Sequence, residues 1–269
     1  MLASLDELAA SVPDGTRLAI AKEDSGAAVA AALALARRGV RDLHLVCVPV
    51  SGIEADLLIG AGCVARIETS AVSLGEFGPA PRFVQAVRSG QVQIVDATCP
   101  AIYAGLQAGQ KGIPFIPLRG IVGSSLLEHR SDWRVIENPF ADGDRIVAIS
   151  AIVPDVALFH APAADRHGNV FLGRDRDGLL LAHASRRTLV TVEHVVEGNL
   201  LEDEARAGAV LPALYVHRIA HAPRGAWPAG FPGHYGPDAA AMTRYAGLAR
   251  SDDGFARALH ELHAGHARA

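Results

Sequence analysis

Apolar positions along the chain follow two spacings, one typical of buried strands and one typical of helices. Thr16 to Ala21 and Leu43 to Val48 are short apolar runs, and the alanine-rich stretch Ala27 to Arg38 lies between them. This order predicts a strand, a helix and a second strand. Before this unit, Ser4 and Glu7 have the spacing of a capping box, which predicts a short first helix.

The alternation continues through the middle of the chain. We expect helices at Ile53 to Ile59 and Pro81 to Arg88, and strands at Val64 to Ala71 and Val92 to Ala97. Further strands are expected around Phe115, Trp133 to Ile136, Arg145 to Ile149, Val156 to His160, Leu189 to Val192 and Tyr215 to His221. Strands separated by helices of this length predict an α/β fold with an open, mainly parallel sheet and helices on both faces.

The last part of the chain changes character. Residues 223–237 are rich in glycine, proline and aromatic residues, which predicts an irregular but ordered connection over the surface. Two helices should follow, at Asp238 to Leu248 and Asp253 to His263. We therefore expect one domain over residues 1–237, with residues 238–269 as a helical C-terminal tail of the same domain.

The composition is that of a folded protein. Half of the 269 residues are hydrophobic and the mean hydropathy is +0.21, which excludes disorder caused by low hydrophobicity. The formal net charge is -4 and no basic run occurs, so nucleic acid is not expected as a partner. No apolar run of about 18 residues occurs, and Asp6 and Glu7 stand where a signal peptide needs positive charge. We expect a cytoplasmic protein with no membrane partner.

Metal and redox chemistry are not expected. The three cysteines have no C-x-x-C spacing and should be buried thiols in a reducing compartment. They are Cys47, Cys63 and Cys99. Three histidines near the C-terminus share one helical face, but Gly265 and the chain end favour a frayed, solvated tail over a metal site. They are His260, His263 and His266.

Common catalytic and nucleotide-binding signatures are missing or misplaced. The chain has neither a G-x-x-x-x-G-K-[ST] phosphate loop nor a G-x-S-x-G nucleophile elbow. Residues 60–65 fit G-x-G-x-x-A, but they follow a helix pattern and precede a strand, the reverse of the dinucleotide-binding order. Glu137 precedes Asn138 and Pro139 at a strand exit, so we interpret it as structural.

Four loops collect glycine, proline and polar residues where strands should end, which is where open parallel sheets bind ligands. They are residues 73–82, 114–125, 138–143 and 164–169. In the second loop, glycines let backbone amides approach a ligand, and Arg119 can hold a carboxylate or phosphate in bidentate fashion.

The order of these motifs resembles the A subunit of family I coenzyme A transferases, above all that of glutaconate CoA-transferase and its relatives in bacterial sterol-ring degradation. The likeness runs from about Asp14 to about Tyr245. The motifs that carry it are Ser73-Leu74-Gly75-Glu76-Phe77-Gly78-Pro79-Ala80-Pro81, Gly112-Ile113-Pro114-Phe115-Ile116-Pro117, Asn138-Pro139-Phe140-Ala141-Asp142-Gly143 and Ala164-Asp165-Arg166-His167-Gly168-Asn169.

The resemblance implies an A2B2 heterotetramer with a homologous B subunit. In the transferases the B chain carries a glutamate that attacks an acyl-CoA and becomes an enzyme-bound CoA thioester through a mixed anhydride. The present chain would then hold no catalytic nucleophile and no permanent cofactor. It would line the acyl or carboxylate pocket of an acyl-CoA:carboxylate CoA-transferase, with coenzyme A thioesters and carboxylic acids as substrates.

The candidate substrate-binding residues come from the first two loops. They are Ser73, Gly75, Glu76, Arg119, Gly120, Gly123 and Ser124. The alternative for Ser73 and Gly75 is a strand-to-helix turn, and for Arg119 an ion pair across the interface with the partner chain. Four residues of the last loop are expected to shape a tight turn rather than touch substrate. They are Asp165, Arg166, Gly168 and Asn169.

Some positions depart from the family pattern. Relatives usually have a glycine pair after the first strand, whereas Ala21 to Gly26 here carries Lys-Glu-Asp, a charged cradle. The segment Asp96 to Tyr103 lacks the glutamate that the sterol-degrading hydrolases use, which favours a transferase. Asp96 is a candidate acid or base, but we favour its interpretation as a cap on the following turn. Trp227 replaces a usual histidine; we expect it to pack in the fold, with the reshaping of an interface pocket as the alternative. The alternatives are a ring-opening CoA-thioester hydrolase subunit of the same fold and a non-enzymatic assembly subunit.

Overall fold

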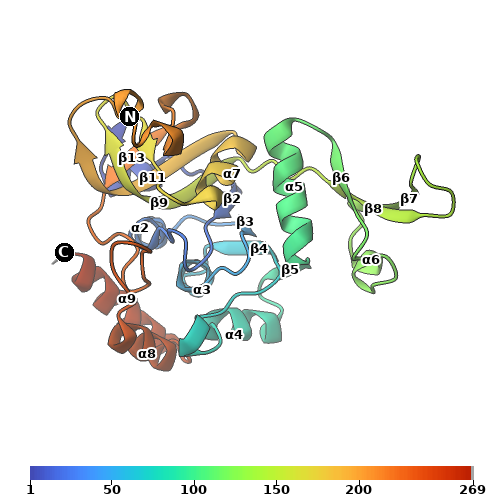
Figure 1. Cartoon of the computed structure of the whole chain (residues 1–269). Helices are drawn as coiled ribbons and strands as arrows, with labels where there is room; N and C mark the ends of the chain where they lie inside the picture. Colours follow the sequence, from blue (N-terminus) through green and yellow to red (C-terminus); the bar gives the residue numbers. More distant parts are fainter. Residues whose placement is uncertain (268–269) are drawn as a thin grey trace.

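A computed structural model describes residues 1–267 and places a ten-stranded sheet at the centre of the molecule (Figure 1). Along the main path of this sheet every neighbouring pair of strands is parallel. The order along that path is β1 (Leu2–Ala3), β13 (Arg218–His221), β11 (Arg187–Val196), β9 (Val156–Asp165), β2 (Arg17–Ile20), β3 (Leu43–Cys47), β4 (Val64–Thr69) and β5 (Gln93–Asp96). The short strands β10 (Val170–Phe171) and β12 (Val210–Leu211) add antiparallel pairs beside β9. The expected open, mainly parallel sheet is confirmed.

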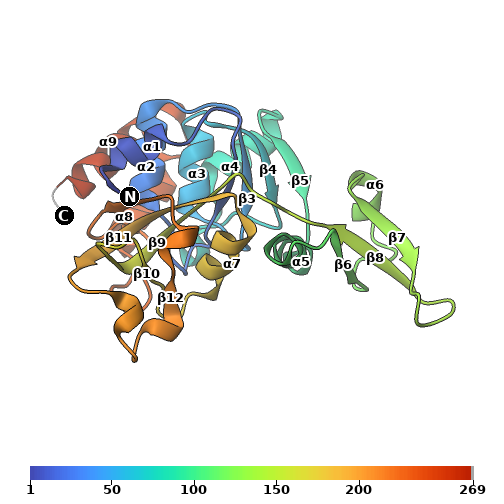
Figure 2. The same ribbon diagram turned by 90° about the horizontal axis from the view of Figure 1, so that it is seen from above.

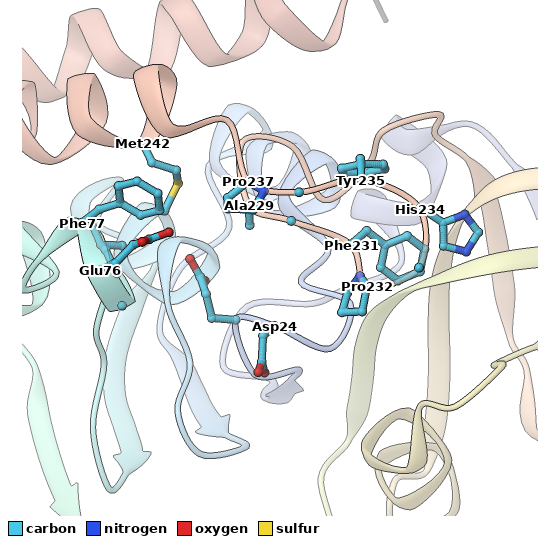
Figure 3. Close-up of a pocket in the computed structure, with 16 residues that line it drawn as sticks. Asp24, Glu76, Phe77, Ala229, Phe231, Pro232, His234, Tyr235, Pro237 and Met242 are labelled. Carbon is cyan, nitrogen blue, oxygen red and sulfur yellow. The ribbon is translucent and has the colours of Figure 1, made fainter.

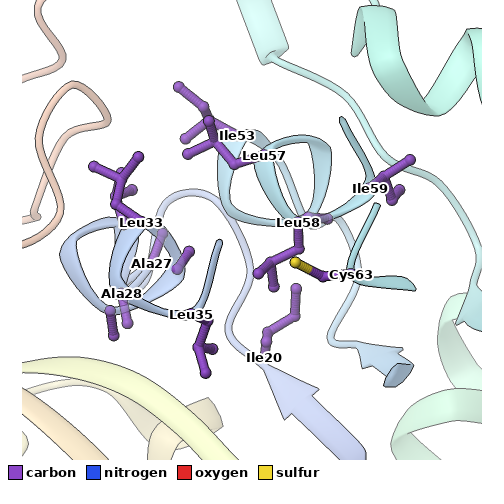
Figure 4. Close-up of a cluster of buried hydrophobic side chains, with 14 of the residues drawn as sticks. Ile20, Ala27, Ala28, Leu33, Leu35, Ile53, Leu57, Leu58, Ile59 and Cys63 are labelled. Atoms are coloured by element: carbon purple, nitrogen blue, oxygen red, sulfur yellow. The ribbon is translucent and has the colours of Figure 1, made fainter. Parts of the chain in front are cut away.

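Helices cover both faces of the sheet. Successive residues of a strand point to opposite faces, so each strand contributes side chains to two apolar clusters. Leu18 and Ile20 of β2 belong to one buried apolar cluster, and Ala19 between them belongs to the other. The first cluster lies under α1 (Leu5–Ala10), α2 (Val29–Arg38), α3 (Ile53–Gly60), α4 (Pro81–Ser89), α8 (Ala239–Leu248) and α9 (Asp252–His266). The second lies under α5 (Cys99–Lys111) and α7 (Arg176–Ala184). Figure 4 shows part of the first cluster, with Leu35 from α2 and Leu58 from α3.

The expected start of the chain is confirmed in detail. Ser4 Oγ accepts the backbone N–H of Glu7 at 3.2 Å, and Glu7 Oε2 accepts the N–H of Ser4 at 2.8 Å, which is the reciprocal capping box. Among residues 1–267 no helix combines the length and the apolar character needed to cross a membrane.

Helix α5 was not expected from the sequence. Thr98 caps it by accepting the N–H of Ala101 at 3.3 Å, so the expectation that Asp96 caps this turn is wrong. Asp96 is exposed at the end of β5. Cys47 and Cys63 are buried as expected, but Cys99, the first residue of α5, is exposed, so its interpretation as a core thiol is wrong. An apolar context along the chain does not reveal that a helix begins at that residue.

A second, smaller sheet projects from the body of the molecule (Figures 1 and 2). It is antiparallel, with the order β6 (Phe115–Leu118), β8 (Arg145–Ser150) and β7 (Trp133–Glu137), and the short helix α6 (Leu126–His129) lies between β6 and β7 in the chain. The sequence located these strands but assigned them to the parallel sheet. A parallel pair needs a long crossover, and the short turn between β7 and β8 allows only a hairpin.

Arg130 ties the projecting sheet to the main sheet. Its Nη2 donates to Glu68 Oε1 of β4 at 2.7 Å and to Asp132 Oδ2 at 2.8 Å, and its Nη1 donates to the backbone oxygen of Asp96 at 3.1 Å. The guanidinium carbon lies 4.0 Å from the centre of the Trp133 ring. Glu68 also accepts Nη2 of Arg17 at 2.8 Å, so one buried carboxylate joins two arginines.

The end of the chain is more ordered than expected. Helix α9 continues through His266, whose Nε2 lies 2.8 Å from the backbone oxygen of Trp227. Trp227 packs against the apolar core and donates Nε1–H to Asp238 Oδ2 at 3.0 Å, as expected of a packing residue. The expected fraying at Gly265 is therefore wrong, since Gly265 itself packs on the Trp227 ring. Within residues 1–267 no group of three or more His, Cys, Asp or Glu side chains is placed to hold a metal ion.

Replacing Arg130 should destabilise the fold strongly, because it leaves the buried Glu68 with one cation fewer. We expect Arg130→Met to lower the free energy of unfolding by about 3 to 5 kcal/mol in urea titrations. Arg145→Met, on the exposed face of β8, is the matched control and should cost less than about 1 kcal/mol. Equal losses for the two variants would contradict the role of Arg130.

Candidate functional site

A cavity of about 600 Å³ opens beyond the carboxyl ends of β2 and β4 (Figure 3). Three segments far apart in the sequence form its walls: the loop after β2, the loop after β4, and the segment that leads into α8. The residues that line it are Glu23, Asp24, Leu74 to Phe77, Ala229 to Pro237 and Met242. The position agrees with the general rule that open parallel sheets bind ligands outside the carboxyl ends of their strands.

The first predicted loop reaches this cavity in part. Gly75 and Glu76 line it, and Figure 3 shows Glu76 on the wall opposite Phe231. Ser73 does not line it; its Oγ accepts the N–H of Gly75 at 3.1 Å, and Gly75 has a φ of 61°, in the left-handed region that favours glycine. Ser73 therefore shapes the turn that presents Glu76, which is the alternative interpretation of this residue.

The second predicted loop lies elsewhere in this chain. Arg119 is exposed and donates Nη2–H to Asp144 Oδ2 at 2.6 Å, within the projecting sheet, so its ion pair is internal to the chain. It lines a separate cleft with Phe115 and Phe140. Three more candidates lie in the turns after β6. They are Gly120, Gly123 and Ser124. Among them, Ser124 Oγ accepts the backbone N–H of Leu126 at 3.2 Å. Within this chain the candidate residues therefore lie in two separate places, those of the first loop at the cavity and those of the second loop on the projecting sheet.

Glu23 lines the cavity but was not among the predicted site residues; the sequence indicated only that it belongs to a charged loop. Its Oε2 accepts the backbone N–H of Ile53 at 2.8 Å, at the start of α3. Gly52 makes this possible, because a Cβ there would lie 1.8 Å from that oxygen. Oε1 is shielded from water and has no hydrogen-bond partner. Burial, with help from Asp24 and Asp56, raises the pKa of Glu23 to about 7, so the group carries a proton in many molecules at neutral pH.

A buried carboxylate fixes the third wall of the cavity. Oε1 of Glu193 on β11 lies 2.7 Å from His160 Nε2 and accepts the Tyr235 hydroxyl at 2.7 Å, and Oε2 accepts the N–H of Arg224 at 2.7 Å. Burial lowers the pKa of His160, so the ring is neutral. Nε2–H faces Glu193, and Nδ1 is left to accept the Thr191 hydroxyl at 2.8 Å.

The same hydrogen bonds determine the charge of Glu193. Burial acts to raise the pKa of this group, but the bonds from His160, Arg224 and Tyr235 outweigh it and lower the pKa to about 2. Residues 223–237 are therefore held to the sheet by an ionised side chain. The expected irregular connection is confirmed, but the segment does more than cross the surface, since it is partly buried and lines the cavity. Its irregular composition did not show what it contacts.

The last predicted loop is a structural turn, as expected. Asp165 Oδ1 accepts the N–H groups of His167 and Asn169 at 2.9 Å each, and Oδ2 accepts Nδ2–H of Asn169 at 2.8 Å and the N–H of Leu200 at 2.9 Å. Gly168 takes a φ of 94°. This loop does not line the cavity.

Comparison with known proteins gives consistent results. The family model described as Coenzyme A transferase matches residues 2–222. The A subunit of 3-oxoadipate CoA-transferase from Pseudomonas knackmussii is 31% identical over 93% of this chain and 88% of that protein. The cholesterol ring-cleaving hydrolase IpdA subunit of Rhodococcus jostii is 31% identical over 81% of this chain and 76% of that protein.

Solved structures agree with the fold over nearly the whole chain. Glutaconate coenzyme A-transferase from Acidaminococcus fermentans superposes with a TM-score of 0.89 at 25% identity, covering 97% of this chain and 87% of that one. A variant of the decarboxylase AibA/AibB superposes with a TM-score of 0.86 at 33% identity, covering 98% of both chains.

Removing the Glu193 carboxylate should destabilise the protein, because three donors, among them the buried His160 ring, lose their acceptor. We expect Glu193→Ala to lower the free energy of unfolding by about 3 to 5 kcal/mol at pH 7. The folded-state pKa lies below the ordinary value of 4.5, so this stabilisation is complete above pH 4.5 and declines as the pH falls towards 2. Glu197→Ala, which removes an exposed partner of Arg166, is the control. A loss no larger than the control's would count against the network.

Glu23 should have the opposite pH dependence. Its folded-state pKa is raised from 4.5 to about 7, so the unfolded chain releases this proton first and the wild type loses stability as the pH rises through that interval. The stability of Glu23→Gln relative to the wild type should therefore rise by about 1 to 3 kcal/mol between pH 5 and pH 8 in urea titrations. Glu197→Gln should run parallel to the wild type. A parallel profile for Glu23→Gln as well would exclude a raised pKa.

Proposed function

The chain belongs to the coenzyme A transferase family, and from this membership we propose that it is the A subunit of an acyl-CoA:carboxylate CoA-transferase built from two kinds of chain. The match of the family model over residues 2–222 is the observation that carries the proposal. Relatives named as A subunits imply a B subunit, and we propose that two A and two B chains form a heterotetramer. Its three cysteines are free, which suits the reducing cytoplasm where we place the enzyme.

In this proposal the covalent chemistry belongs to the B chain. Its glutamate attacks the thioester carbonyl, the CoA thiolate leaves, and an acyl-enzyme anhydride forms. The thiolate then attacks the glutamyl carbonyl of that anhydride, which releases the first acid and leaves an enzyme-bound CoA thioester. The acceptor acid reverses the sequence. Coenzyme A is thus a substrate, and no resident cofactor is needed.

The A chain contributes the surroundings of the acyl group. We propose that Gly75 and Glu76 line the acyl pocket at the end of β4, with Ser73 as the residue that shapes their turn. Glu23 is unsuited to act as nucleophile, because one oxygen is held by Ile53 and the other is shielded from solvent.

The projecting sheet suits contact with the partner chain. Phe115 and Phe140 are 41% and 94% exposed on it, which is unusual for large apolar side chains. We propose that Arg119, with Gly120, Gly123 and Ser124, acts on substrate across this interface rather than in the cavity of its own chain. This arrangement would reunite the two groups of candidate residues in the assembled enzyme.

A hydrolase is the second candidate, because the IpdA subunit named as a cholesterol ring-cleaving hydrolase is also similar to this chain. The segment after β5 argues against a hydrolase, because it contains no glutamate. Asp96 there is exposed, and Thr98 and Cys99 only begin α5. A hydrolase would consume acyl-CoA with no acceptor acid present.

The transferase proposal is tested by trapping the intermediate. The purified A chain alone should exchange CoA between acids at no detectable rate, and adding the B chain should start exchange. Borohydride or hydroxylamine added with acyl-CoA should modify a glutamate of the B chain and no residue of this one. Modification of this chain, exchange by this chain alone, or acyl-CoA consumption that needs no acceptor would each overturn the proposal.

A further inference from the structure

Helices α2 and α3 both begin without a cap of their own. The N-cap residues are Ala28 for α2 and Gly52 for α3, and neither has a side chain that can accept a backbone N–H. The first N–H groups of a helix have no partner within the helix and need an acceptor from outside it. The two helices pack together over the first apolar cluster (Figure 4). Their missing acceptors come from each other's surroundings.

Each helix start receives a carboxyl oxygen from the segment that belongs to the other helix. Glu23 lies just before α2, and its Oε2 accepts the N–H of Ile53, the first residue of α3, at 2.8 Å. Glu54 is the second residue of α3, and its Oε2 accepts the N–H of Ala28 at the start of α2 at 3.0 Å. We call these two bonds, which run in opposite directions between the same two segments, the reciprocal cap.

Neither carboxyl group of the reciprocal cap has a counter-ion. Glu54 is fully buried, and among the described residues no cation pairs with it or with Glu23. The Oε1 atom of each residue is shielded from water and has no hydrogen-bond partner. The start of α3 favours negative charge, but this effect is smaller than the cost of burying an unpaired carboxylate. Burial therefore raises the pKa of Glu23 to about 7 and that of Glu54 to about 8.

The groups around the reciprocal cap do not relieve this cost. Glu23 itself raises the pKa of Glu54, and Asp24 and Asp56 raise that of Glu23. The titratable and charged groups on the surrounding elements are Asp24 in the loop after β2, Cys47 on β3, Asp56 on α3, Glu76 across the cavity, Arg82 on α4 and Tyr245 on α8. Arg82 acts on Asp56 and donates to Asp252 at 2.7 Å. Its charge does not act on either glutamate of the reciprocal cap.

Residues 23–28, which the reciprocal cap holds, connect several parts of the candidate site. Glu23 and Asp24 line the cavity. The backbone oxygen of Gly26 accepts the N–H of His160 on β9 at 2.7 Å. Just beyond, the N–H of Ala30 donates to the backbone oxygen of Gly225 at 2.9 Å, in the segment that forms the third wall. Release of residues 23–28 from α3 would therefore loosen one wall of the cavity directly.

We propose that the reciprocal cap is a pH-sensitive switch, which holds residues 23–28 against α3 while Glu23 and Glu54 are protonated and releases this wall of the cavity when they lose their protons. The inference concerns the conformation of the chain, so it does not depend on the reaction that the site performs.

The direction of the effect follows from the linkage between protonation and opening. In an opened segment both carboxyl groups reach water and ionise near the ordinary pKa of 4.5, whereas in the closed segment Glu23 and Glu54 keep their protons up to a pH of about 7 and about 8. Opening therefore becomes more favourable as the pH rises from 5 to 8. Above that interval both states are ionised, and the balance changes little.

Hydrogen exchange of backbone amides in the full-length chain tests this directly, at the N–H groups of Ile53 and Ala28. After correction for the intrinsic pH dependence of exchange, we expect their opening constants to rise at least roughly 100-fold between pH 5 and pH 8. The N–H of Ala101 is the matched control, because a neutral hydroxyl, that of Thr98, caps it at the start of α5. An equal rise at Ala101 would assign the effect to the whole fold, and no rise at Ile53 and Ala28 would exclude the switch; either result overturns the inference.

Glutamine variants then identify the groups that titrate. In Glu23→Gln and Glu54→Gln the amide oxygen can still accept the backbone N–H, but the side chain cannot ionise. Each single variant should keep about half of the pH dependence on a logarithmic scale, and the double variant should lose it. Glu197→Gln, an exposed position beyond β11, should behave as the wild type. A double variant that keeps the full pH dependence would contradict the inference, and if it does not fold, the wild-type comparison with Ala101 decides alone.

Discussion

The ionised carboxylate of Glu193 is the interaction on which the candidate site depends. It joins β11 to residues 223–237, which have no regular structure of their own, through the Tyr235 hydroxyl and the backbone N–H of Arg224, and it joins β11 to β9 through His160. A glycine- and proline-rich segment cannot hold its shape by helix or ladder hydrogen bonds, so its shape must come from a few strong contacts. With this wall in place, loops at two strand ends are enough to close a cavity.

The charges around the cavity follow from where each carboxylate lies. Glu193 receives three hydrogen bonds and remains ionised, whereas Glu23 receives one and is largely buried, so its charge is disfavoured. The same residue type therefore acts as an anchor in one place and as a weak acid in the other.

The features that depend on local apolar spacing and turn chemistry could be predicted from the sequence. The features that depend on contacts between distant segments could not. The strand and helix from Thr16 to Arg38 and the turn at Asp165 followed from apolar spacing and turn chemistry, and the structure confirms them. The strands β6 to β8 were located, but apolar runs do not say which sheet a strand joins, so Arg119 was grouped with Glu76 although the two lie apart in this chain. The role of Glu23 depends on the absence of a Cβ at Gly52, a contact between distant loops that no local pattern contains.

The central claim is that this chain forms the acyl-binding half of a shared active site. A crystal structure of the A–B complex with a thioether analogue of an acyl-CoA tests it most directly. The account predicts acyl density between Glu76 and Phe231, with a carboxylate of the partner chain within reach of the thioether carbon. Acyl density outside this cavity, or a cavity closed off from the partner, would contradict it.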